Sequence, residues 1–380
     1  MKRLIATIAF LLCYGLKAQV TQDVFESFKL QQKRNVSYYI PENYSAAKKY
    51  PIVVVLDAEY LFDNVVANTK FRSRFQGMPE CIVVGVNQYK NEQRYYDCGF
   101  EKDTGLPTDD GKKFFEFLGM ELIPYLEGNY STAPFKMFVG YDITANFGNF
   151  YLFKEKSIFN AYISISPTLA PEMETRVPAR LGALDQKIFY QLILEGEKTK
   201  DRAGILAIDK AIKALDKDNI YYNFTEYPLA DHVTVATYGI GPALDNIFSI
   251  FKPISPKEYK EEILTSDDPP FKYMENKYAT IQELFGFKKP IELNDIMAIY
   301  AASKKKEDYG SLKSLSDLCK KEFPDTMMGF YFEGECYEHE GQAKKALRTY
   351  EKAFGMEEID FLTKEMALEK IDALKADFGF

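Results

Sequence analysis

Two continuous runs of apolar, mostly β-branched residues constrain most strongly what this 380-residue chain can fold into. They read YPIVVVLD at residues 50–57 and CIVVGV at residues 81–86. A strand with one face in water alternates apolar and polar residues, whereas an unbroken apolar run is typical of a central strand that is covered on both faces. These two runs therefore predict the middle of a parallel sheet with helices on either side.

Strand and helix patterns alternate through the first 250 residues. Further strand patterns lie at 35–40, 136–142, 159–166, 188–194 and 219–228, and helical patterns lie at 111–126, 143–155 and 202–216. Strands separated by helices of this length form parallel sheets with both faces covered. The sequence thus predicts the α/β fold class with a mostly parallel central sheet.

The chain changes character after residue 252. A polar segment with several prolines is followed by helical patterns rich in Lys and Glu, which predicts an all-α domain over 253–380. Small and aromatic residues there follow the spacing of a tetratricopeptide repeat (TPR): Phe330, Gly334, Tyr337, Gly341, Ala346, Tyr350 and Ala353. A weaker copy contains Tyr300, Cys319 and Pro324, and 361–378 would form a capping helix. The alternative is an ordinary helical extension.

The first 18 residues read as an export signal. Lys2 and Arg3 precede an apolar stretch at 4–12, and Ala18 is a small residue suited to cleavage before Gln19. The stretch is shorter than the ~20 residues that span a bilayer. We therefore predict a signal peptide at 1–18, a mature α/β domain at 19–252 with no transmembrane span, and a location in the periplasm or at the outer membrane of a bacterium.

Charge and composition exclude several classes of function. The chain has 48 basic and 56 acidic residues, for a net charge of −8, which argues against a nucleic-acid partner. It has two histidines and lacks a Gly-rich phosphate loop and a Cys-x-x-Cys motif, so we predict neither a metal nor a cofactor.

Four cysteines follow the export signal. They form two pairs, each 17 residues apart: Cys81 with Cys98, and Cys319 with Cys336. In an oxidising compartment this spacing permits two local disulfides. The alternative is four separate buried thiols.

The order and spacing of several segments resemble one enzyme family. These segments are 40–64, 83–97, 117–130, 138–153, 161–169 and 227–236. Residues 34–250 resemble the family of α/β-hydrolases that includes esterase D and the enterochelin-type esterases. The resemblance implies an α/β-hydrolase sandwich with its nucleophile at the turn between the strand at 136–142 and the next helix.

The chain departs from the family at that turn. The family motif is Gly-x-Ser-x-Gly, and this chain keeps Gly140 but places Asp142 where the nucleophilic Ser is expected. Thr144 stands in a glycine position, and its β-branched side chain leads us to expect a widened or rearranged turn. The resemblance assigns the oxyanion hole to Ala58 and Ile143, of which Ile143 would be misaimed by such a change.

The remaining triad positions are partly retained. His232 matches the family's catalytic histidine, and Glu197 is the favoured acid to orient it, with Glu195 and Asp201 as alternatives. We expect an exported, catalytically degenerate protein that binds a protein partner through 253–380, in an envelope complex. The competing hypothesis is a hydrolase of an activated ester or related substrate that uses Asp142 as nucleophile, with His232 activating water.

Several aromatic residues are expected near the rim of the cleft. They are Tyr60, Phe62, Tyr95, Tyr96 and Phe100. They would line a retained pocket for a ligand or a partner peptide, or else fill the space beneath the loops.

Overall fold

The computed structural model describes residues 20–88, 90–196 and 199–379, which form two compact units. The first unit comprises the described residues up to Phe251 together with Leu284–Phe287. The second unit comprises Lys252–Glu283 and the described residues from Lys288 onward. The predicted export signal at 1–18 lies outside the described residues. Among those residues, no helix combines the length and the apolar character needed to cross a membrane.

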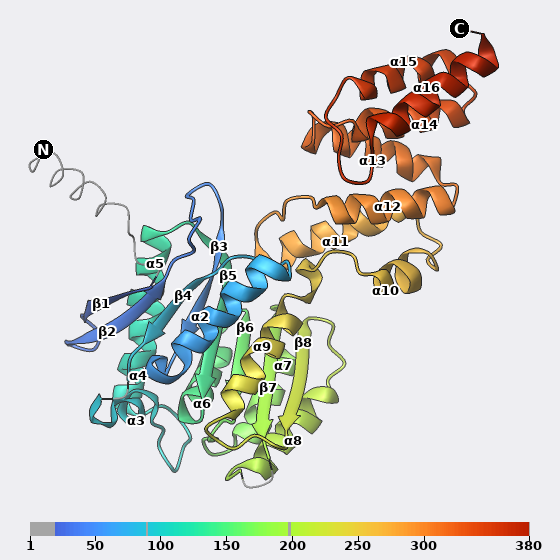
Figure 1. Ribbon diagram of the computed structural model, residues 1–380. Helices are drawn as coiled ribbons and strands as arrows, with labels where there is room; N and C mark the ends of the chain where they lie inside the picture. Colours follow the sequence, from blue (N-terminus) through green and yellow to red (C-terminus); the bar gives the residue numbers. More distant parts are fainter. Residues whose placement is uncertain (1–19, 89, 197–198, 380) are drawn as a thin grey trace, which may run out of the picture. The chain divides into compact units, whose positions relative to one another are not determined.

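The first unit is built on one eight-stranded sheet with the order β1-β2-β4-β3-β5-β6-β7-β8 (Figure 1). The strands are β1 (Val20–Ser27), β2 (Gln32–Tyr39), β3 (Tyr50–Val55), β4 (Ile82–Val86), β5 (Thr132–Tyr141), β6 (Ala161–Ile165), β7 (Ile188–Glu195) and β8 (Ile220–Tyr227). From β4 to β8 all neighbours are parallel, whereas β1 and β2 add an antiparallel edge. The predicted fold class is confirmed.

Helices cover both faces of this sheet (Figure 1). Helices α2 (Ala58–Phe75) and α9 (Val235–Ile247) pack together on one face, where the absence of a side chain at Gly85 admits Phe62 of α2. The other face packs against α3 (Gln93–Cys98), α4 (Asp109–Glu116), α5 (Ile123–Asn129), α6 (Ile143–Asn149), α7 (Met173–Ala183) and α8 (Arg202–Lys213). Alternate residues of β3, such as Ile52 and Val54, face this larger core.

The second unit is all helical. It contains α10 (Pro256–Glu258), most of α11 (Pro270–Phe285), α12 (Leu293–Lys305), α13 (Tyr309–Glu322), α14 (Met328–His339), α15 (Ala343–Phe354) and α16 (Lys364–Phe378). From α12 to α16 each helix packs against the next. Gly334 lets α14 approach α15, because a Cβ added there would lie 2.6 Å from the Tyr350 ring. The small residue therefore marks a helix crossing, as its spacing predicted.

The four cysteines of the described chain are free and buried. The two local disulfides that the spacing permits are therefore not formed in the structure. Burial raises the pKa of the Cys336 thiol to about 11 and that of Cys319 to about 12. All four thiols pack as small apolar side chains.

Candidate active site

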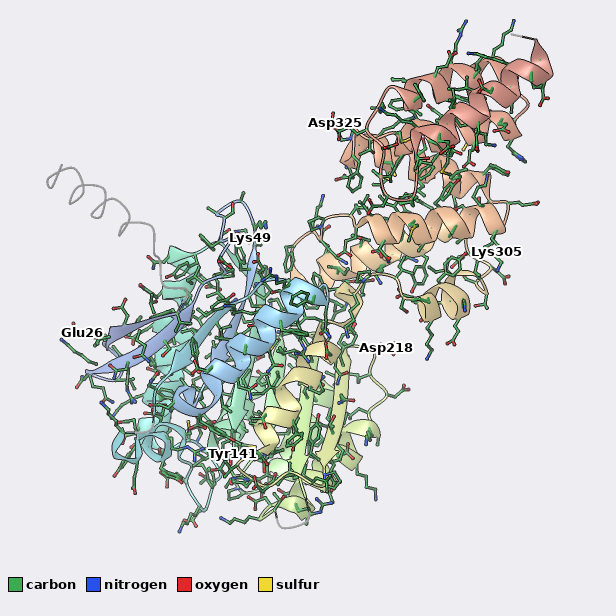
Figure 2. The ribbon with its side chains drawn as sticks, in the orientation of Figure 1. Glu26, Lys49, Tyr141, Asp218, Lys305 and Asp325 are labelled. Atoms are coloured by element: carbon green, nitrogen blue, oxygen red, sulfur yellow. The ribbon has the colours of Figure 1, made fainter. Side chains whose placement is uncertain are left out.

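The turn between β5 and α6 holds Asp142 in a strained conformation. Its φ of 55° and ψ of −123° are uncommon for a residue with a Cβ. The Asp142 N–H donates to the carbonyl of Ile165 at 2.9 Å, and the Asp142 carbonyl accepts from the N–H of Thr168 at 3.1 Å. The end of β6 and the segment after it thus fix the backbone of this turn, which lies beside Tyr141 (Figure 2).

Thr144 is part of a tight turn. A Cβ added to Gly140 would lie 2.7 Å from the Thr144 carbonyl, so strand and helix meet closely. The side chain of Thr144 is fully buried, and its hydroxyl accepts from the Tyr141 N–H at 2.8 Å and reaches the Asp57 carboxylate at 2.9 Å. The β-branched side chain of Thr144 is thus accommodated in this turn by hydrogen bonds.

We predict that Thr144→Val lowers the free energy of unfolding by about 1–3 kcal/mol, because Val keeps the shape but leaves the buried Tyr141 N–H without its acceptor. Urea unfolding followed by circular dichroism measures the change. Thr69→Val is the matched control, since the Thr69 hydroxyl is buried and donates to the carbonyl of Val66 in its own helix. Equal losses in the two variants would contradict a special role of the Thr144 hydroxyl.

Arg94 of α3 connects this turn to the end of β3. Its guanidinium binds Asp57 through two bonds, from Nε to Oδ1 at 2.8 Å and from Nη2 to Oδ2 at 3.0 Å. Nη1 lies 3.1 Å from Oδ2 of Asp142, and the hydroxyl of Thr168 donates to the other oxygen of that carboxylate. Both oxygens of Asp142 are therefore engaged by neighbouring side chains.

Burial and ion pairing shift the pKa values of Asp57 and Arg94 in opposite directions. Burial raises the pKa of Asp57, and the charge and hydrogen bonds of Arg94 oppose that rise. The pKa of Arg94 is raised by its two acidic neighbours, although burial works against that shift. Arg94 consequently stays protonated, and it is the counter-charge of both carboxylates.

His232 is oriented by an acid at the end of β7. Nδ1 of His232 lies 2.8 Å from Oε1 of Glu195, and the Ser166 hydroxyl approaches the same nitrogen at 3.4 Å. Burial alone would raise the pKa of Glu195, but the hydrogen bonds with Ser166 and His232 lower it. Glu195, one of the two alternatives, thus takes the position of the orienting acid.

The structure describes one of the other two acid candidates, Asp201. Glu197 lies outside the described residues. The carboxylate of Asp201 accepts from the N–H of Leu169 at 3.3 Å.

The structure does not join Asp142 to His232. Among the residues that the structure describes, no hydrogen bond or ion pair links the two side chains, since Asp142 pairs with Arg94 and His232 with Glu195. The ring of Tyr141 packs on the His232 ring with centroids 4.8 Å apart, and its hydroxyl donates to the His232 carbonyl at 2.7 Å. Tyr141 therefore holds the histidine loop against the turn.

A pocket of about 430 Å³ opens beside these groups. Its lining residues are Asp57, Glu59, Tyr60, Arg94, Tyr141 and Val233. Among the predicted rim aromatics, Tyr60 lines this pocket, whereas Phe62 is buried and Tyr95 and Tyr96 are exposed. In the described part of the chain, no cluster of His, Cys, Asp and Glu could hold a metal ion.

The two predicted oxyanion-hole residues begin helices that directly follow two central strands of the sheet. Ala58 is the first residue of α2, after β3, and Ile143 is the first residue of α6, after β5. Since β3 and β5 are adjacent and parallel, both backbone positions lie at the carboxyl ends of neighbouring strands. This is the edge at which ligands bind in sheets of this type.

Sheet order, the strained strand-to-helix turn and the acid–histidine pair together define an α/β-hydrolase. The chain belongs to the "Putative esterase" family, whose profile matches residues 27–229. No curated protein matches the chain.

Three solved structures show how far the similarity extends. An uncharacterised protein from Capnocytophaga ochracea is 34% identical, with 94% of this chain and 100% of that chain covered and a TM-score of 0.87. An IroE-like serine hydrolase from Shewanella oneidensis is 19% identical, with 80% and 99% covered and a TM-score of 0.60. The BES protein from Bacillus cereus is 19% identical, with 60% and 94% covered and a TM-score of 0.53. The last two matches show a shared fold.

Proposed function

We propose that this chain is an exported, catalytically degenerate member of its esterase family and acts as a binding or assembly module of the bacterial cell envelope. The observation that carries the proposal is the state of Asp142. This residue stands at the turn where the family motif places its serine, and its carboxylate is bound by Arg94 and Thr168 rather than by His232.

Asp142 does not supply the hydroxyl that a nucleophilic serine would. A serine hydrolase needs a hydroxyl whose proton is taken by the neighbouring histidine. A carboxylate at this position has no hydroxyl proton for the histidine to take. The Arg94 guanidinium, 3.1 Å away, also stabilises the negative charge of Asp142 and so makes the carboxylate a weaker nucleophile. The pair of His232 and Glu195 then has no hydroxyl at Asp142 to activate.

Two features of the sequence support export and the binding of a protein partner. Residues 1–18 have the pattern of an export signal, which supports a location in the periplasm or at the outer membrane. Residues 253–380 carry a TPR-like pattern, and stacked helical pairs of that kind present surfaces to protein partners.

One alternative has a specific observation in its favour. The pair of His232 and Glu195 at 2.8 Å and the adjacent pocket are what a hydrolase with Asp142 as nucleophile would need. Such an enzyme would have to free the Asp142 carboxylate from Arg94 and Thr168 before each attack. The degenerate protein is favoured because it requires no such rearrangement.

Hydrolysis of p-nitrophenyl acetate and butyrate tests the proposal. We expect the purified protein to release p-nitrophenol no faster than its His232→Ala variant, and Asp142→Ser to gain a rate that depends on His232. Thr144 is retained in this variant because its hydroxyl holds the turn. His339→Ala is the control, since it replaces the only other histidine of the sequence. Turnover by the wild type that disappears in His232→Ala alone would establish the hydrolase instead.

A further inference from the structure

Three consecutive helices of the second unit bring lysines and aromatic rings together on one surface. This lysine–aromatic surface consists of Lys313 and Lys320 of α13, Phe330 and Tyr337 of α14, and Lys345 and Lys352 of α15. Each helix contributes two residues that are seven positions apart. Seven residues are two helical turns, or about 10.5 Å along the axis, so the two residues share a face.

The surface has two rows, each with one ring between two lysines. In one row, Nζ of Lys313 and Nζ of Lys345 lie 5.8 and 5.4 Å from the centroid of the Tyr337 ring. In the other row, Nζ of Lys320 and Nζ of Lys352 lie 5.2 and 3.9 Å from the centroid of Phe330. Both rings are partly exposed. Contact with a ring face holds an ammonium group in place and reduces the side-chain entropy that a further ion pair would cost.

The α13 half of this surface already has its counter-charge. Glu333 lies between the rows and binds Lys313 at 2.6 Å and Lys320 at 2.8 Å. Burial alone would raise the pKa of Glu333, but these two lysines lower it. Asp317 lies within 3.8 Å of the same lysines. This half is therefore close to neutral.

The α15 half has a different charge balance. Lys345 and Lys352 are exposed, and among the residues that the structure describes neither forms an ion pair with a carboxylate. Two fixed and uncompensated cations thus lie beside partly exposed rings, on a chain whose net charge is −8. Such a surface is complementary to a ligand with two carboxylates and an apolar stretch between them.

We propose that the lysine–aromatic surface binds an extended, acidic protein segment with carboxylates three residues apart. In a segment with the extended polyproline II conformation, three residues make one turn and span about 9 Å, so carboxylates three residues apart lie on one side, close to the two-turn separation of Lys345 and Lys352. The side chains between the carboxylates would lie against Tyr337 and Phe330. This inference rests on the proposed role of residues 253–380 as a partner-binding region, and it names the chemistry of that partner.

Fluorescence anisotropy with the full-length mature protein tests the inference. The probe is a fluorescein-labelled peptide with glutamates at its fourth and seventh positions, leucines between them and serines elsewhere. We expect saturable binding at low salt, and weakening by about tenfold or more in the Lys345→Glu/Lys352→Glu variant, which turns two attractions into repulsions.

The matched control is Lys257→Glu/Lys272→Glu, which changes the net charge equally. These two lysines are exposed, lie on α10 and α11, and pair with Glu261 and Glu275. We expect the control to bind the probe within about twofold of the wild type, because only local charge matters at this range. Circular dichroism melts check that both variants remain folded.

Three outcomes would overturn the inference. The first is equal binding of the probe and of its analogue with glutamine in place of glutamate. The second is equal weakening in the two double variants. The third is a dimer of the wild type that Lys345→Glu/Lys352→Glu dissolves while the probe does not bind, because the occupant would then be a second copy of the chain. None of these results bears on the ester assay, so failure here and failure of the proposed degenerate site are distinguishable.

Discussion

Replacing Arg94 with methionine should lower the free energy of unfolding by about 3–5 kcal/mol, the usual cost of removing one partner from a buried ion pair. The side chains of Asp57 and Asp142 are only 10% and 17% exposed, and Arg94 is the cation that faces both of them. Methionine fills similar space but leaves two carboxylates close together without a counter-charge. Urea unfolding of the purified variant measures the loss.

The same variant should also respond differently to pH. In the native protein burial raises the pKa of Asp57 and Arg94 opposes the rise more strongly than the Thr144 hydrogen bond does, so removing Arg94 increases the upward shift. A carboxyl whose pKa is raised in the folded state binds more protons folded than unfolded, and its penalty disappears as the pH falls through that pKa. The stability difference from wild type should therefore be larger at about pH 7 than at about pH 5.

Two further variants separate charge from packing. Arg74→Met removes an exposed arginine from the same unit and should change the stability by less than about 0.5 kcal/mol. Adding Asp57→Asn and Asp142→Asn to Arg94→Met should recover most of the loss, because no uncompensated charge then remains. A loss in Arg94→Met that these amides do not relieve would assign the effect to packing instead.

The fold was predictable because its central strands carry an unambiguous pattern. The unbroken apolar runs at 50–57 and 81–86 became β3 and β4, which are buried on both faces. Helix α2 was not predicted as a helix, although it lies directly between those strands. Its sequence, AEYLFDNVVANTKFRSRF, mixes β-branched, aromatic and charged residues, and its apolar face becomes recognisable only once the sheet is in place.

Asp142 was predictable because it follows a strand directly, and His232 because its loop resembles the family's. Asp142 lies at the end of β5, and the strand-to-helix order located it. Arg94 could not be assigned, because its partners are 37 and 48 residues away and α3 must first pack beside the turn. The prediction for Thr144 considered only the size of its side chain, whereas its hydroxyl forms the hydrogen bond that accommodates it in the turn.

Which acid orients His232 depends on where β7 ends. Glu195 and Glu197 are two positions apart and would share one side of an extended strand. Residue 195 is the last one of β7, where it pairs with Tyr227 of β8. This strand pairing cannot be derived from a single sequence. It fixes Glu195 at the carboxyl end of β7, within hydrogen-bonding distance of His232.

In the second unit, Tyr350→Ala should lower the local free energy of unfolding by about 3–5 kcal/mol, because it empties the contact on which α14 and α15 meet. The Tyr350 ring is fully buried, lies against Gly334 and packs edge-on against Tyr331. Hydrogen exchange of peptides from α14 and α15, measured by mass spectrometry on the full chain, should show the lost protection.

Tyr350→Phe is the control for that experiment, since it keeps the ring and removes only the hydroxyl that binds Glu338 at 2.8 Å. Glu338 retains Lys370 at 2.9 Å, so the cost should be about 1 kcal/mol. If the two variants lose protection equally, the hydroxyl rather than the ring joins these helices. If only the alanine variant loses protection, the packing of the Tyr350 ring against Gly334 is what joins α14 to α15.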